Sequence, residues 1–173
     1  MTPQAETLTP AQFAHRLKSV EATAFRLEQQ PTYAVGYEDE AFASFLRGQP
    51  QSPTEVADFV AWCDQIRDQT ARGVRVERVR VHQDPPTDYQ RWVRWVGRWN
   101  EEAGEVMYYT TPERVAAVGL QVAGADDWWL LDDTALIRMT YQQPGIATSY
   151  LVTDPAEVGK AREWWQLALQ AAA

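Results

Sequence analysis

The segment from residue 54 to residue 81 constrains the fold most, because it reads as a long helix joined directly to a strand. From Val56 to Ile66, apolar residues recur at helical spacing, Thr54 can cap the helix, and Gly73 ends it. Residues 74–81 then carry four valines, which favour a strand. The valines lie at 74 and 76 and then at 79 and 81, a slip that indicates a bulge or a strand covered on both faces. We expect this strand to be central in its sheet.

Capping boxes and turn residues place the other elements. Thr9 with Gln12 and Thr87 with Gln90 each start a helix, and Pro155 opens a closing helix. The remaining helical patterns cover 38–46 and a turn at 112–118, and the remaining strand patterns cover 22–28, 106–109, 128–131, 135–141 and 146–152. The last three strands are separated by Asp132-Asp133-Thr134 and Gln143-Pro144-Gly145, both turn-forming sequences, which predicts an antiparallel meander.

These elements predict one domain of the α/β or α+β class. Its mixed sheet has about five or six strands flanked by helices and ends in the antiparallel meander and the closing helix. A chain of 173 residues is the size of a single domain. We expect residues 9–173 to form it and residues 1–8, which show no periodicity, to be irregular or disordered.

Charge and composition exclude several classes of function. Twenty-four acidic residues oppose sixteen basic residues, and the net charge of −8 disfavours direct nucleic-acid binding and membrane-surface binding. One cysteine allows no internal disulfide, and the N-terminus lacks a signal-peptide pattern, so we expect a cytoplasmic protein. With two histidines 67 residues apart and no glycine-rich phosphate loop, the sequence predicts neither a metal nor a cofactor.

Four segments carry a resemblance to a known family. They are Ala24–Glu28, Arg72–Val81, Asp127–Asp133 and Leu151–Pro155. In this order they resemble an actinobacterial family of uncharacterised domains that are often encoded beside helix-turn-helix regulators. The resemblance spans about residues 10–168 and implies a regulatory setting, with a helix-turn-helix regulator as a candidate protein partner. It carries over no catalytic residues.

The order of elements is also similar to one repeat of the phospholipase D-like fold. Activity in that fold needs a histidine and a lysine two residues apart, followed by an aspartate, whose place Asp133 takes here. Asp126 and Trp128 occupy the places of the histidine and lysine, and neither can attack or hold a phosphate. The resemblance therefore implies an inactive member of the fold.

His82 is the candidate acid or base. It directly follows the valine-rich strand, where open α/β sheets place a ligand crevice, and Asp84 and Asp88 follow closely. A carboxylate beside an imidazole raises its pKa and fixes its tautomer, as general acid–base catalysis requires. In the alternative interpretation, His82 ends the strand and Asp84 bonds the amides of the turn.

Two pairs of aspartates bracket the strand at residues 128–131. Paired carboxylates can bind a divalent cation or share a proton, but Asp126-Asp127 and Asp132-Asp133 also lie where turns favour aspartate. Four extended residues hold the pairs ~13 Å or more apart, so we favour turn roles.

The helix at 87–103 presents two aromatic faces. One stripe should face the core and contains Tyr89, Trp92, Val93, Val96 and Trp99. Arg91, Trp95 and Arg98, flanked by Arg94, form a second face on which an indole lies between guanidinium groups, an arrangement suited to an aromatic or anionic ligand or an acidic partner. The alternative is a solvated face with Trp95 half buried by a neighbouring loop.

Two hypotheses of function follow. The first is a non-catalytic binding or regulatory protein that acts through protein contact at the second face of this helix. The second is a small cofactor-independent enzyme that takes an aromatic or anionic metabolite in a tryptophan-lined pocket, with His82 and Asp88 as its acid–base pair. A closed cavity above ~300 Å³ lined by these two residues and by tryptophans would favour the enzyme. Cys63 lies on an apolar helical stripe and is expected to be a buried, inert thiol.

Overall fold

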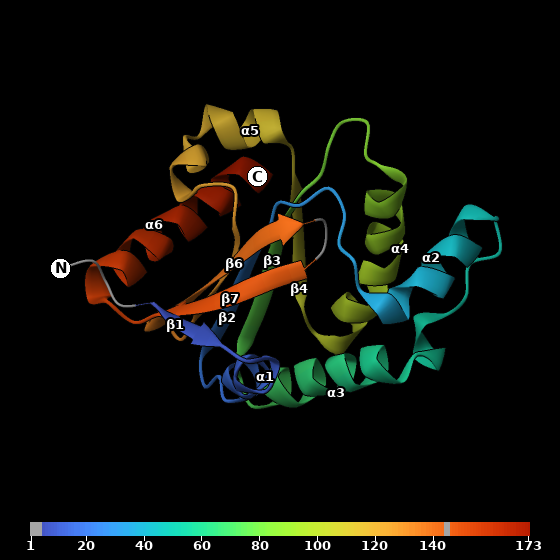
Figure 1. Ribbon diagram of the computed structural model, residues 1–173, viewed down its shortest axis with the longest axis horizontal. Coiled ribbons are helices and arrows are strands. Elements are labelled where there is room, and N and C mark those ends of the chain that lie inside the picture. The colour runs from blue at the N-terminus through green and yellow to red at the C-terminus, as the bar shows by residue number, and fades with distance from the viewer. Residues whose placement is uncertain (1–4, 144–145) are drawn as a thin grey trace.

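A seven-stranded mixed sheet forms the centre of the molecule, which a computed structural model describes over residues 5–143 and 146–173 (Figure 1). The strand order is β1-β7-β6-β5-β2-β3-β4. β2 is parallel to β3 and β3 to β4, and every other neighbouring pair is antiparallel. The strands are β1 (Glu6–Leu8), β2 (Thr23–Glu28), β3 (Arg75–Val81), β4 (Val106–Thr110), β5 (Asp127–Leu131), β6 (Ala135–Gln143) and β7 (Ile146–Val152).

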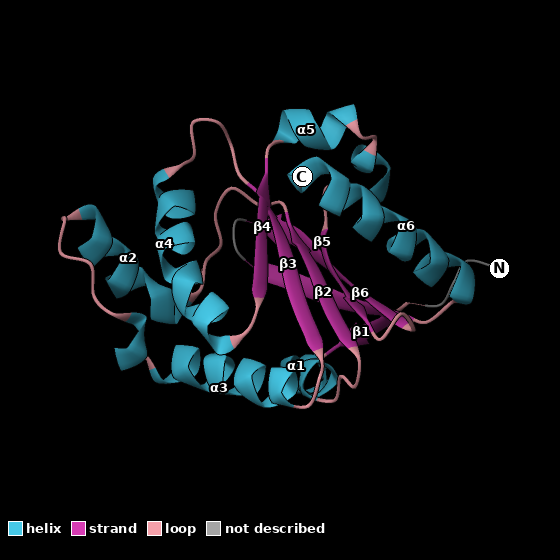
Figure 2. Cartoon of the chain, turned by 180° about the vertical axis from the view of Figure 1, so that it is seen from behind, coloured by secondary structure: helices cyan, strands magenta, loops and turns pink. Residues whose placement is uncertain are grey.

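Helices cover both faces of this sheet. α5 and α6 lie on one face, α1, α3 and α4 lie on the other, and α2 packs on the outer side of α4 (Figure 2). The helices are α1 (Pro10–Lys18), α2 (Asp39–Leu46), α3 (Ala57–Ala71), α4 (Asp88–Ala103), α5 (Pro112–Ala117) and α6 (Pro155–Ala172), with 3-10 turns at Gly36–Glu38, Pro53–Glu55 and Leu120–Ala123. The predicted α/β class, with its mixed sheet, antiparallel C-terminal strands and closing helix, is confirmed.

Three local predictions are corrected. Both capping boxes form, at Thr9 and Thr87, but Thr54 does not cap α3. The Ser52 side chain instead accepts from the Thr54 amide and starts a 3-10 turn, so that α3 begins after Val56. β3 is not central but lies next to the edge strand β4.

The third correction concerns the segment of residues 1–8, predicted to be irregular or disordered: residues 6–8 form β1, and residues 1–4 lie outside the described residues. β1 pairs with β7 and buries Leu8 in the core beside Leu17 and Leu151. Three residues are too few to show periodicity, and only a partner strand distant in sequence gives them their conformation. The predicted turn at 143–145 includes residues 144–145, which lie outside the described residues.

The slip in the valine pattern of β3 reflects burial on both faces. Val74 and Val76 pack with Trp129 under α1 and α3, whereas Val79 and Val81 pack with Trp165 of α6. On the α3 face, the positions that continue the alternation after Val76 are arginines. On that face, the apolar side chains of Val74 and Val76 are therefore followed along the strand by the buried charged side chains of Arg78 and Arg80.

Among residues 5–143 and 146–173, no helix is both long and apolar enough to cross a membrane. Cys63 is buried, as predicted, with 3% of its surface exposed, and burial raises the pKa of its thiol. Its Sγ points toward the Trp99 carbonyl at 3.9 Å.

Candidate functional site

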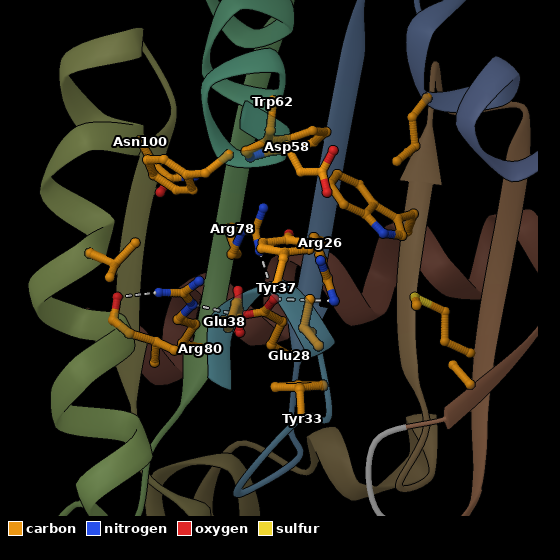
Figure 3. Close-up of a pocket in the computed structure, with 18 of the residues that line it drawn as sticks. Arg26, Glu28, Tyr33, Tyr37, Glu38, Asp58, Trp62, Arg78, Arg80 and Asn100 are labelled. Carbon is orange, nitrogen blue, oxygen red and sulfur yellow. Dashed lines mark hydrogen bonds and ion pairs between the residues drawn. The ribbon is translucent and has the colours of Figure 1, made fainter. Parts of the chain in front are cut away.

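A cavity of about 500 Å³ lies between the sheet and the helices on the α3 face (Figure 3). β2, β3, β5 and β6 form its floor. The walls come from α1, α3, α4 and the segment of residues 33–38 that leads into α2, and Ala147 of β7 completes the lining. Its size is in the range of small-molecule sites.

Three arginines and one glutamate form the polar floor. Arg26 and Glu28 of β2 lie opposite Arg78 and Arg80 of β3 in the parallel register, so all four side chains share one face. The Glu28 carboxylate accepts from Nη1 of Arg78 at 2.6 Å and from Nε of Arg80 at 2.5 Å, and it lies 3.1 Å from Nη2 of Arg26. One carboxylate thus gathers three guanidinium groups.

The charges in this floor hold one another ionised. Burial alone would raise the pKa of Glu28, but the positive charges of Arg26, Arg78 and Arg80 outweigh it and hold that pKa well below its ordinary value. Glu105 accepts from Nε of Arg78 at 2.7 Å. Burial alone would lower the pKa of Arg78, but the negative charges of Glu105 and Glu28 outweigh it and hold that pKa above its ordinary value. The cluster is therefore charged at neutral pH.

Arg26 is the most exposed of the three arginines, and not all of its donors have protein acceptors among the described residues. Its side chain is 15% exposed, against 5% for Arg78 and 11% for Arg80. Its Nε is buried without an acceptor among the described residues, and its guanidinium lies over the Trp129 ring at 5.1 Å. The Arg26 side chain lines the cavity, so a movement that uncovers one of its free donors lets it form a further hydrogen bond to an oxygen acceptor.

Asp127 of β5 ties one wall of the cavity to the sheet. The Tyr33 hydroxyl donates to its Oδ2 at 2.6 Å, the Tyr141 hydroxyl donates to the same oxygen at 3.2 Å, and the Gln29 amide donates to Oδ1 at 2.8 Å. Burial is the main cause that raises the pKa of this carboxyl, despite Arg26 4.0 Å away. These bonds hold residues 29–33 against β5 and β6.

Aromatic side chains form most of the wall. Trp62 of α3 and Trp92 of α4 face the cavity together with Trp129, and Tyr33, Tyr37 and Tyr89 add three more rings. The indole nitrogens of Trp92 and Trp129 are buried without an acceptor among the described residues. The predicted core stripe of α4 thus faces this cavity through Tyr89, Trp92, Val93 and Val96.

Glu38 brings a second carboxylate to the cavity wall. The Tyr89 hydroxyl donates to its Oε2 at 2.9 Å. Burial first, and then the negative charge of Glu28, raise the pKa of Glu38. No arginine or lysine of the described chain lies within ion-pair distance of it.

The structure places His82 outside the cavity and away from both predicted carboxylates. Its ring is buried beside Tyr109, with the centroids 5.3 Å apart. Asp88 pairs with Arg91, and within the described chain neither Asp84 nor Asp88 bonds to the imidazole. The expectation of a raised imidazole pKa is wrong, because burial and then the charges of Arg80 and Arg94 lower the pKa of His82 to about 4.

The residues of the predicted second face lie together on the outer side of α4. Arg91, Arg94 and Arg98 are exposed, while Trp95 is half buried against Phe45 and Trp99. The neighbour that covers Trp95 is helix α2 and not a loop. The Arg98 guanidinium lies over the Trp95 and Trp99 rings at 5.5 and 5.3 Å, and that of Arg94 lies over Tyr109.

The four aspartates have separate roles. Asp132 accepts backbone hydrogen bonds from residues 21–23, and Asp132 and Asp133 have positive φ, as their turn requires. Asp126 accepts from the Thr140 hydroxyl at 3.2 Å. Asp126 and Asp127 thus depart from the predicted turn role, and Asp127 does so as a buried carboxylate beside the cavity floor.

Sequence reasoning missed the four floor residues. One signal was present in β3, where the slip of the valine pattern indicates a strand covered on both faces, so that Arg78 and Arg80 had to point inward. In β2, the alternation of Leu27 with Arg26 and Glu28 is that of a half-buried strand, whereas the structure covers both of its faces. The pairing of β2 with β3, which joins them, is not visible in either strand alone. Among residues 5–143 and 146–173, no three histidine, cysteine, aspartate or glutamate residues gather in a group that could hold a metal ion.

Fold and site define a class of protein: a single α/β domain with an aromatic-walled cavity over a buried arginine–glutamate floor. The chain belongs to the family described as domain of unknown function DUF6879, whose model matches residues 11–173. No curated protein matches it.

Proposed function

We propose that this domain binds a small organic molecule in the cavity and does not transform it. Arg26 carries the proposal, because its partly exposed side chain lines an aromatic-walled cavity and, among the described residues, forms ion pairs only with Glu28 and Asp127. Arg78 and Arg80, by contrast, each donate two hydrogen bonds. A guanidinium with unused donors on a cavity floor favours a ligand with an oxygen acceptor. The aromatic walls favour a ligand with an apolar or aromatic body.

The lining of the cavity supports binding more than catalysis. Within the described chain it contains no histidine, cysteine, serine or lysine. The enzyme hypothesis placed His82 and Asp88 in a tryptophan-lined cavity, whereas this cavity has the tryptophans without either residue. A His82 whose pKa is about 4 is also a weak base.

Titration calorimetry with small carboxylic acids, amides and amino acids tests the proposal. Arg26→Gln should weaken binding of a hit at least tenfold, since a charge-assisted hydrogen bond is lost. Arg91→Gln, which removes an equal charge from the exposed face of α4, should leave the affinity unchanged.

A second variant separates loss of binding from loss of folding. Ala147 lines the cavity, so Ala147→Leu should fill part of it without touching the arginines. The exposed Ala14→Leu is the matched control. Binding that survives both Arg26→Gln and Ala147→Leu would place the ligand elsewhere.

The outer face of α4 supports a second candidate, contact with a protein partner. Its observation is the half-buried Trp95 between exposed arginines on a chain of net charge −8, which favours an acidic partner segment. Under this second candidate, the partner would be a helix-turn-helix regulator, in keeping with the regulatory setting that the family resemblance implies. The same proposal includes an actinobacterial host and an inactive phospholipase D-like fold. Capture of a purified candidate regulator should fall with Arg98→Glu and with rising salt, and should not respond to Asp64→Asn.

A further inference from the structure

The cavity offers opposite charges at two places. Arg26 on the floor has donors to spare, and Glu38 on the wall is a carboxylate that receives only the Tyr89 hydroxyl. Both line the same cavity, together with Tyr37 (Figure 3). A bound molecule can therefore contact both groups.

The charge balance of the floor limits what the ligand can carry. Three guanidinium groups face three carboxylates, Glu28, Glu105 and Asp127, so the floor is formally neutral. Glu38 then adds an uncompensated negative charge to the wall, and the exposed Asp58 adds another at the rim. A phosphate or a dicarboxylate would bring two negative charges to this balance and be repelled by Glu38.

A zwitterion satisfies both ends without adding net charge. Its carboxylate can accept from Arg26, and its ammonium group can donate to Glu38, whose partial burial makes an unpaired charge unfavourable. Its apolar part can lie against Trp62 and Trp129, which border the same space. A primary ammonium near these rings also gains a cation–π contribution.

We propose that the ligand of this cavity is a zwitterion of the amino-acid type, with its carboxylate on Arg26, its ammonium on Glu38 and an apolar side chain against the aromatic wall. This inference rests on the proposed function and names its ligand class. Free amino acids and short peptides share these end groups, and the experiment distinguishes them by length.

The test compares end-group derivatives by titration calorimetry. The probes are L-phenylalanine, L-tryptophan, L-leucine and the dipeptide Leu-Phe, each as the free compound, the N-acetyl derivative and the C-terminal amide. At least one free compound should bind ten times more tightly than both of its derivatives, since each derivative loses one charged contact. The length of the best probe decides between amino acid and peptide.

Two variants test which side chain binds each charged group of the ligand. Glu38→Gln should reduce the preference for the free compound over its N-acetyl derivative to about one, while the preference over the amide persists. Arg26→Gln should reduce the preference for the free compound over its amide to about one, while the preference over the N-acetyl derivative persists. Glu40→Gln, a neighbouring exposed charge on α2, should change neither ratio, and circular dichroism confirms that each variant is folded.

Three other outcomes would contradict the zwitterion inference, and they differ in what they imply for the proposed function. If N-acetyl derivatives bind as well as free compounds, the zwitterion inference is overturned while the proposed function stands. If no probe of this series binds but another molecule binds in an Ala147-sensitive manner, the inference fails alone. If no molecule binds to the cavity in either screen, both fail.

Discussion

Glu28 of β2 and Arg78 of β3 form a buried ion pair, in which Nη1 of Arg78 donates to Oε1 of Glu28 at 2.6 Å. The pair is staggered by two residues in the parallel register, where Arg26 faces Arg78 and Glu28 faces Arg80. This stagger lets one carboxylate reach three guanidinium groups. Glu28 is thus the group that keeps three buried positive charges together under the cavity.

Glu28→Gln should destabilise the fold strongly. Breaking a buried ion pair by removing one partner costs ~3–5 kcal/mol, because the remaining charges stay buried without compensation. The free energy of unfolding in urea measures this loss. Asp64→Asn, which breaks the exposed pair with Arg67, is the control and should cost less than ~1 kcal/mol. Equal losses in the two variants would show that Glu28 does not hold the floor together.

His82 should make stability depend on pH between about 7 and 5. Its pKa is about 4 in the folded chain and near 6.5 when unfolded, so only the unfolded state takes up a proton in this window. Stability is therefore full above the unfolded pKa and falls as the pH drops, by about 2 kcal/mol from pH 7 to pH 5.

Urea unfolding of His82→Gln at several pH values tests this. The variant should lose most of the dependence between pH 7 and pH 5, whereas the exposed His15→Gln should keep it. Glu38 and Asp127, whose folded pKa values are raised, act in the opposite direction at lower pH, and both are present in all three chains. An unchanged slope in His82→Gln would contradict the buried neutral imidazole.

Local sequence signals predicted most of the fold. The capping boxes at Thr9 and Thr87, the helix stop at Gly73 and the strand pattern at 22–28 each depend on a few neighbouring residues, so each can be recognised in the sequence. Strand β1 and the place of β3 near the sheet edge depend on pairing with residues distant in sequence. No local pattern encodes such pairing.

The candidate site was predictable only in part. The aromatic stripe of α4 was recognised from its spacing, but it was assigned to a solid core when it borders a cavity. Helical periodicity shows which side of α4 faces the interior. It does not show whether other side chains pack against that side or a cavity borders it. Arg26 and Arg80 come from separate strands, and only the sheet register makes them one floor.

Gly104 should tolerate alanine less well than Gly119. Both have positive φ, +111° and +78°, which costs alanine ~1–2 kcal/mol. At Gly104 an added Cβ would also lie 2.7 Å from Oγ1 of Thr70, whereas at Gly119 no atom lies within 4 Å. Gly104→Ala should therefore lose a further ~1–3 kcal/mol of unfolding free energy.

Thr70→Ala separates the two causes at Gly104. In the Gly104→Ala background it should recover most of the loss due to crowding, measured as a coupling energy in a double-mutant cycle, because only Cβ of residue 70 remains, 3.1 Å from the added Cβ. The backbone part should remain. If Gly104→Ala and Gly119→Ala lose the same free energy, helix α3 does not approach the end of α4 as closely as the structure places it.

Trp92 and Trp95 should differ in their contributions to stability although both lie on α4. Trp92 is 3% exposed and packs against Phe42 and Tyr89, whereas Trp95 is half buried against Phe45 and Trp99. Trp92→Ala should cost ~3–5 kcal/mol of unfolding free energy. Trp95→Ala should cost about half as much, because part of its ring already contacts water. Urea unfolding of both variants, with Arg91→Ala as the exposed control on the same helix, decides the order. A larger loss for Trp95 would show that the outer face of α4 is a structural contact with α2, and the protein-contact candidate would lose its main support.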